Sequence, residues 1–170
     1  MDVKEAIIRR RSIRAFVSKP IPEDVLNRLL DAARMAPSAK NRQEWRFIVV
    51  CDAEARKRVV EATNNQLFVG AALVILVFCA NEKDYVMRCG QNGGTVDLSI
   101  ALSYVTLAAV EEGLGTCWVG SFYEDKMKAA LGIPDQARVV AITPLGYPAE
   151  DPPARGRKSL REVVSYDKWG

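Results

Sequence analysis

The stretch GTVDLSIALSYVTLAAVEE, residues 94–112, decides the fold class of this chain. We expect one long helix that begins at Gly94 or Thr95 and ends at Glu112, because Gly113 follows where helices commonly stop. Its apolar residues, which face several sides, are Val96, Leu98, Ile100, Ala101, Leu102, Val105, Leu107, Ala108 and Val110. A helix with this pattern is buried all round, either in the core or against a second subunit.

Buried strands and shorter helices flank this helix in the sequence. The predicted strands are Trp45–Val50, Leu73–Cys79 and Arg138–Leu145, with a further extended segment at Thr116–Val119. The predicted helices are Val3–Arg9, a helix that opens at Pro22 and ends before Pro37, Ala53–Ala62 and Glu124–Leu131. Apolar spacing and helix-boundary residues support these assignments. The pattern predicts an α+β fold with a central sheet.

The chain changes character after Gly146, where it becomes polar and rich in proline. The segment Leu160–Tyr166 (LREVVSY) then resembles a strand that arrives late, beyond the compact body. A strand at the end of an extended arm is well placed to pair with another chain. We therefore predict one domain over residues 1–170, in which residues 150–170 form an arm.

Composition excludes several classes of function. A chain of 170 residues has the length of about one domain, and 49% hydrophobic with 26% charged residues is typical of globular proteins. The chain has no histidine, which excludes Ser-His-Asp and Cys-His hydrolases and most catalytic zinc sites. The net charge of +3 is too small to indicate nucleic-acid binding unless the charge is clustered.

Cysteine spacing and the N-terminus bear on metal binding and location. The four cysteines form no CxxC pair, so a zinc ribbon or dithiol motif is not supported and no metal is expected. The segment MDVKEAIIRRR lacks the apolar core of a signal peptide, and no uninterrupted apolar stretch reaches about 18 residues. We expect a cytoplasmic protein that does not enter a membrane.

Two arginine clusters could bind an anion. Arg9-Arg10-Arg11-Ser12-Ile13-Arg14 places four arginines around a hydroxyl, and Arg155-Gly156-Arg157-Lys158 lies in the tail. Guanidinium groups bind phosphate oxygens bidentately, and a serine hydroxyl adds a donor. The chain has neither GxGxxG after a strand nor a GK[ST] loop, so a nucleotide phosphate would depend on such side chains. Taken one at a time, each cluster is also compatible with a solvated basic face, and RRRSIR with nucleic-acid binding.

The segment APSAKNRQEW, residues 36–45, joins a helix to a strand and is rich in hydroxyl and amide side chains. Asn41 and Gln43 offer both donors and acceptors, which suits the edge of a heterocycle. In isolation the favoured interpretation of the segment is an ordinary loop with Trp45 packed in the core.

Taken together, these blocks resemble a known family. RRRSIRAF, APSAKNRQEWRF, GLGTCWVG and LGYPAEDPPARGRKSL occur in this order in the nitroreductase-like FMN-dependent oxidoreductases, and the likeness covers nearly the whole chain. The resemblance implies an α-β-α sandwich around a mixed, mainly antiparallel sheet. It also implies an obligate homodimer with two FMN molecules at the interface and a C-terminal tail that extends onto the partner.

The resemblance also implies flavin-site residues. Arg10 and Ser12 match residues that hold phosphate and ribityl, and Arg14 matches a cation near the N1–C2=O edge of the ring. Arg11 matches a more variable position of the same block. The second phosphate contact matches Arg155 and Arg157, with Lys158 close behind.

Further cofactor contacts are implied from three other segments. The loop that reaches the flavin from the other subunit corresponds to Pro37, Ser38, Ala39 and Asn41. Asn65 and Gln66 match the contact with the pyrimidine edge, and the backbone amides of Gly120 and Ser121 match those that face flavin N5. No side chain is implied as catalytic, because flavin N5 carries the chemistry and Arg14, Gly120 and Ser121 tune it.

Three departures from the family pattern affect these expectations. Glu44 stands where the family usually has proline, which makes the loop less rigid and more acidic. Phe68 stands where some members have a second lysine directed at the ring, so the charge near N1 rests on Arg14. Residues 85–94 are short where longer members insert helices over the substrate, which leaves the pocket open.

The expected activity is NAD(P)H oxidation by ping-pong hydride transfer through flavin N5 to a small acceptor, such as a nitroaromatic, a quinone or a flavin. A cation near N1 stabilises the reduced ring, and hydride transfer to N5 requires no histidine base. Alternatives are a specialised family reaction (reductive dehalogenation or dehydrogenation), a flavin carrier with little turnover, and a non-catalytic basic module. The sequence does not discriminate between NADH and NADPH.

Overall fold

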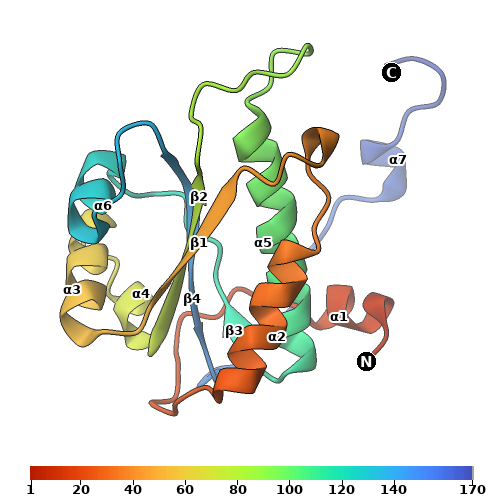
Figure 1. Ribbon diagram of the computed structural model, residues 1–170. Helices are drawn as coiled ribbons and strands as arrows, with labels where there is room; N and C mark the ends of the chain where they lie inside the picture. Colours follow the sequence, from red (N-terminus) through yellow and green to blue (C-terminus); the bar gives the residue numbers. More distant parts are fainter. Residues whose placement is uncertain (170) are drawn as a thin grey trace.

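The computed structural model describes residues 1–169, which form three layers with a sheet in the middle (Figure 1). The sheet has the strand order β1-β2-β4-β3, and every pair of neighbouring strands is antiparallel. The strands are β1 (Trp45–Val50), β2 (Val74–Ala80), β3 (Gly115–Thr116) and β4 (Arg138–Gly146). One parallel bridge, between Ser12 and Thr116, adds the segment RRRSIRAF (residues 9–16, the N-terminal block) to the β3 edge of the sheet. This architecture confirms the predicted α+β sandwich.

Helices cover both faces of the sheet (Figure 1). The first three helical elements are α1 (Val3–Arg9), α2 (Glu23–Arg34) and the short 3-10 helix η1 (Ala39–Asn41). The remaining helices are α3 (Ala53–Ala62), α4 (Leu67–Ala71), α5 (Gly93–Glu111), α6 (Glu124–Leu131) and α7 (Leu160–Val163). The sequence patterns predicted α1, α3, α6 and β1 at these bounds, whereas α4 and η1 were not predicted.

The central strand β2 shows why two cores form. Successive side chains of a strand point to opposite faces, and all seven residues of β2 are buried. Leu76 and Phe78 pack with α2 and α5, whereas Ile75 and Val77 pack with α3 and α6. The uninterrupted apolar run of β2 is therefore explained by helices on both of its faces.

Helix α5 is the longest helix in the layer that α2 and α5 form on one face of the sheet. By length and composition it could cross a membrane, but half of that stretch is buried inside the protein, as expected of a core helix. Asn92 caps its start by accepting a hydrogen bond from the Thr95 amide, and Gly113 follows its end with φ +69°. Several of its apolar residues remain only half-buried, so within this single chain the helix is not enclosed all round.

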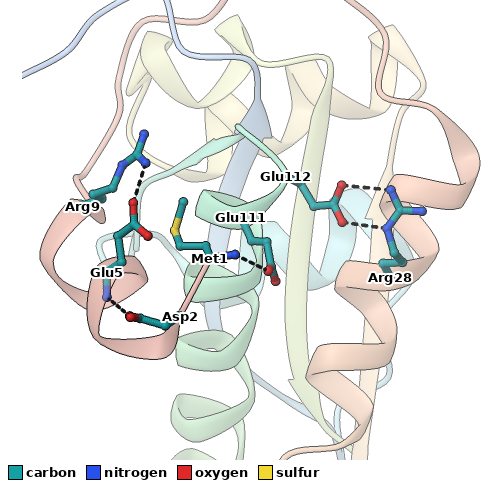
Figure 2. Close-up of polar contacts among 7 residues, drawn as sticks. All are labelled: Met1, Asp2, Glu5, Arg9, Arg28, Glu111 and Glu112. Atoms are coloured by element: carbon teal, nitrogen blue, oxygen red, sulfur yellow. Dashed lines mark hydrogen bonds and ion pairs between the residues drawn. The ribbon is translucent and has the colours of Figure 1, made fainter.

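Ion pairs hold two other helices at the C-terminal end of α5 (Figure 2). Arg28 on α2 makes a two-pronged contact with Glu112, at 2.6 and 2.9 Å. The N-terminal ammonium of Met1, just before α1, lies 3.2 Å from Glu111. The Arg28 contact lowers the pKa of Glu112. These contacts place α1, and the arginine block after it, beside the end of α5.

The prediction of a strand at 160–166 is wrong, because Leu160–Val163 is the helical turn α7. The Glu162 carboxylate accepts hydrogen bonds from the backbone N–H and the hydroxyl of Ser159, at 2.8 and 2.9 Å. This local capping favours a helical turn over the β preference of Val163 and Val164. The turn lies on an arm that stands away from the body (Figure 1), and its side chains are exposed.

Candidate functional site

The two arginine clusters predicted from the sequence meet in the fold. Together they line one cavity of about 390 Å³ between the end of α1 and the tail. The predicted residues that line it are Arg10, Arg11, Ser12, Arg14, Arg155 and Arg157. Lys158 follows in the tail but does not line this cavity. Residues separated by more than 140 positions in the sequence thus form a single cationic surface.

The N-terminal block is positioned by one buried residue. Ile13 is 6% exposed, and its backbone N–H donates to the Thr116 carbonyl at 2.9 Å. Because side chains alternate along an extended segment, burying Ile13 turns Ser12 and Arg14 away from the core. Gly115 permits this packing, since a Cβ there would lie 2.7 Å from Cγ1 of Ile13.

The arginines of the cavity differ in how far the protein already engages them. Arg11 donates to the carbonyls of Ile8 and Arg10 at the end of α1, at 2.6 and 3.0 Å. Arg157 donates to carbonyls of its own segment. Among the described residues, the guanidinium groups of Arg10 and Arg155 have neither a hydrogen bond nor an ion pair. Those two groups are therefore available to bind an anion.

The tail is anchored to the N-terminal block before it reaches the cavity. The Ala149 amide donates to the Ala15 carbonyl at 2.9 Å. One oxygen of the Glu150 carboxylate accepts from the backbone N–H groups of Arg14 and Ala15, at 2.5 and 3.1 Å. Glu150 thereby fixes the two walls of the cavity to each other. Sequence reasoning did not single it out, because a carboxylate that binds distant backbone amides has no local pattern.

A second group of predicted residues adjoins Arg14. The Arg14 guanidinium lies over the Phe68 ring, 5.7 Å from its centre. Phe68 is the residue that stands where some family members have a second lysine. The Gln66 side-chain amide donates to the Ser121 carbonyl at 2.7 Å, which joins the turn before α4 to the segment after β3. Asn65 instead lines a separate hollow beside α3.

The amides predicted to face the flavin are open. Gly120 and Ser121 are exposed, and their backbone N–H groups make no hydrogen bond within the part of the chain described. A Cβ on Gly120 would meet only the indole nitrogen of Trp118, at 3.9 Å. Trp118 is itself 42% exposed, which is unusual for a large aromatic residue and was not predicted. This region presents free donors next to an aromatic surface.

A cysteine lies beneath the arginine block. Burial raises the pKa of the Cys117 thiol, while the charge of Arg14, the adjoining Ser12 hydroxyl and the charge of Arg10 oppose that rise. The thiol is therefore close to three of the predicted flavin-site residues. It remains protonated near neutral pH and adds no negative charge to the cationic cavity.

The predicted loop contacts lie elsewhere in the same chain. The Ala39 amide donates to Asp97 near the start of α5, whereas Ser12 pairs with Thr116 beyond its end. From Asp97 to Glu111 the helix rises about 21 Å, at 1.5 Å per residue. One chain therefore does not bring the loop residues Pro37, Ser38, Ala39 and Asn41 to the arginine cavity.

The chain is similar in sequence to known proteins over most of its length. Residues 7–71 and 61–147 match the sequence model of the nitroreductase family. The NADH dehydrogenase of Thermus thermophilus is 33% identical over 195 aligned residues, covering 96% of this chain and 95% of the Thermus protein. The FMN reductase (NAD(P)H) of Bacillus subtilis is 29% identical, over 98% of this chain and 74% of its own length.

A solved structure extends the similarity to the fold. A nitroreductase family protein from Clostridium novyi superposes with a TM-score of 0.82 at 35% sequence identity. The alignment covers 100% of this chain and 96% of the Clostridium chain.

Proposed function

This chain belongs to the nitroreductase family, and from that premise we propose that it is an FMN-dependent NAD(P)H oxidoreductase with small-molecule acceptors. The observation that carries the proposal is the cavity of about 390 Å³ where Arg10, Ser12 and Arg14 meet Arg155 and Arg157. The domain that holds this site comprises residues 1–170, with residues 150–170 as an arm.

The donors of the cavity fit the phosphate end of FMN. Arg10 and Arg155 have uncommitted guanidinium groups, and charged hydrogen bonds to phosphate are about twice as strong as neutral ones. The Ser12 hydroxyl supplies a further donor for phosphate or ribityl oxygens. The other residues that line the cavity are Ile7, Ile8, Pro152, Pro153 and Ala154.

Other residues would orient the ring system. Arg14 would supply a cation to the pyrimidine edge, where it would favour the negative charge that builds up on reduction. The free N–H groups of Gly120 and Ser121 would donate toward N5. Gln66, bonded to the Ser121 carbonyl, keeps that segment in place. When bound, FMN would supply the two-electron hydride chemistry between NAD(P)H and the second substrate, in the ping-pong order that we propose.

We infer a homodimer in which each flavin site uses both chains. The loop at residues 37–41 lies about 21 Å along α5 from the arginine end, so a second copy is needed to bring it to that cavity. The arm also carries exposed apolar side chains that a partner could cover: Leu160, Val163, Tyr166 and Trp169. A helical turn on an extended arm can pack on a second copy as readily as the strand predicted from the sequence.

The acceptor would enter an open pocket. The connection between β2 and α5, residues 81–92, is short and turns back on itself, with a bridge between Val86 and Asn92. We propose acceptors such as quinones, nitroaromatics or free flavins, which need little enclosure. The four cysteines are free thiols, which favours a reducing compartment such as the cytoplasm.

Steady-state oxidation of NADH and NADPH with a quinone, a nitroaromatic and a flavin tests the activity. Turnover with parallel double-reciprocal plots would support ping-pong hydride transfer. A protein that binds FMN but fails to oxidise either nucleotide with any acceptor would be a flavin carrier, and the proposed activity would be wrong.

A further inference from the structure

A buried carboxylate beneath the 37–43 loop has no cationic partner. Asp97 is 7% exposed, and none of the ion pairs among the described residues includes it. Both of its oxygens lie within hydrogen-bond distance of the Ala39 amide, at 3.1 and 3.2 Å. Burying a carboxylate is costly unless donors compensate for the lost water. Its position near the N-terminal end of α5 and the Ala39 N–H provide that compensation.

The loop itself is in an unfavourable backbone conformation. Lys40, Asn41 and Gln43 have φ values of +54°, +55° and +54°, in the left-handed region that costs free energy for residues with a side chain. Its inner hydrogen bonds run from Asn41 N–H to the Ser38 carbonyl and from Gln43 N–H to the Ser38 hydroxyl. Such bonds close the turn but do not attach it to the body.

Two sets of contacts attach the 37–43 loop to the rest of the protein. Arg42 pairs with Glu82 at 2.7 Å and lies over the Tyr85 ring, but these contacts are exposed and follow the turn. The bond from Ala39 to Asp97 is the one that joins the middle of the turn to the core helix. Without an acceptor at position 97, the strained turn would lose the contact that fixes it relative to α5.

We propose that Asp97 is a positioning residue for the flavin site, which holds Ser38, Ala39 and Asn41 in the conformation that contacts the cofactor bound by the partner subunit. The inference rests on the proposed function, because the loop matters to catalysis only if FMN lies between two copies. Asp97 does not touch the cofactor in this account. It pre-organises the loop, so that binding does not have to order it.

Three variants of the holoprotein test the role. Asp97→Leu removes the acceptor and puts a larger apolar side chain in its place, and Asp97→Asn keeps one side-chain oxygen that can accept from Ala39. Thr106→Val is the matched control, because Thr106 is also buried on α5 but bonds only within the helix, to the Ser103 carbonyl. The readouts are hydrogen exchange of the peptide that contains residues 38–43 and the rate at which FMN leaves the diluted holoprotein.

Asp97→Leu should speed both exchange of the loop and FMN release by about tenfold, the loss of one good hydrogen bond. Asp97→Asn should stay within about threefold of the parent, and Thr106→Val should change neither readout. If Asp97→Leu does not accumulate folded, Asp97→Ala removes the same acceptor without branched bulk.

Two results would overturn the inference: unchanged FMN release in a folded Asp97→Leu protein, or equal damage by Asp97→Asn and Asp97→Leu. A parent protein that binds no FMN would instead refute the proposed function.

Discussion

Replacing Gly115 by alanine tests how the N-terminal block is held against the sheet. The new Cβ would lie 2.7 and 2.8 Å from Cγ1 and Cβ of Ile13, both of which belong to a buried side chain. Carbon atoms in contact normally stay 3.5–4.0 Å apart, so Ile13 has to move by roughly 1 Å. Because Ser12 and Arg14 flank Ile13 on the same segment, both should shift with it.

The expected cost follows from that displacement. Overpacking of this size destabilises a protein by about 1–3 kcal/mol. For a chain of this length each kcal/mol lowers the Tm by about 2–4 °C, so thermal unfolding should shift by roughly 2–12 °C. Misplacing the charged donors should also weaken FMN binding, by about tenfold or more if one charged hydrogen bond is lost. Calorimetry and an FMN titration measure the two effects.

A control and a double variant make this prediction refutable. Gly156→Ala, on the opposite wall, adds a Cβ that meets nothing within 4 Å and should leave the Tm unchanged. Ile13→Ala removes the atoms that collide, so the Ile13→Ala/Gly115→Ala pair should cost less than the sum of its members, by about 0.5–3 kcal/mol. Parent-like stability of Gly115→Ala, or strict additivity in the pair, would show that Ile13 does not pack against Gly115.

Four further outcomes are expected. Arg10→Ala should weaken FMN binding by about 1.5–3 kcal/mol, while Arg9→Ala, which removes only an exposed ion pair, should not; equal affinities by titration would mean that the N-terminal block is not the phosphate site. Deleting residues 160–170 should lower dimer stability, and unchanged dissociation in sedimentation would refute the arm's role. Burial raises the pKa of Cys79 from 9.0 to about 12, so the folded state keeps the thiol proton to higher pH than the unfolded state does. The free energy of unfolding, measured in urea, should therefore fall as pH rises from about 9 toward 12. Cys79→Ala should remove this pH dependence. The lowered pKa of Glu112 has the opposite effect on the pH dependence of stability. The Arg28–Glu112 contact stabilises the folded state above pH 4.5, the pKa of an unperturbed glutamate, and this stabilisation is lost as the pH falls below that value. Glu112→Gln should abolish this pH dependence.

Local elements could be predicted from the sequence because their patterns are local. Helical spacing and cap residues defined α1, α3 and α6, and an apolar run defined β2 to within one residue. The error at Leu160 arose because β-branched residues there favour a strand, whereas a capping box decided the local conformation. Because the side chains of α7 do not pack against the body of the protein, the short-range hydrogen bonds between Ser159 and Glu162 determine the conformation of this segment.

The site was predictable only in part. The resemblance assigned Arg10, Ser12 and Arg155 to one phosphate site, and in the fold these residues line one cavity. Their binding of FMN stays a prediction. Asp97 and Glu150 were missed, because each binds backbone amides 58 or more positions away and the sequence around them has no distinguishing pattern. The resemblance already implied that the 37–41 loop reaches the flavin from the other subunit, and the fold adds the distance of about 21 Å along α5 that separates this loop from the arginines of its own chain.

The central claim, that this chain binds FMN in the arginine cavity, is tested most directly by the visible absorption spectrum of the freshly purified protein, with mass analysis of whatever heat releases. The account predicts a yellow protein that releases about one FMN per chain. A colourless protein that also fails to bind added FMN would contradict it, and the arginine cavity would then serve a different anionic ligand.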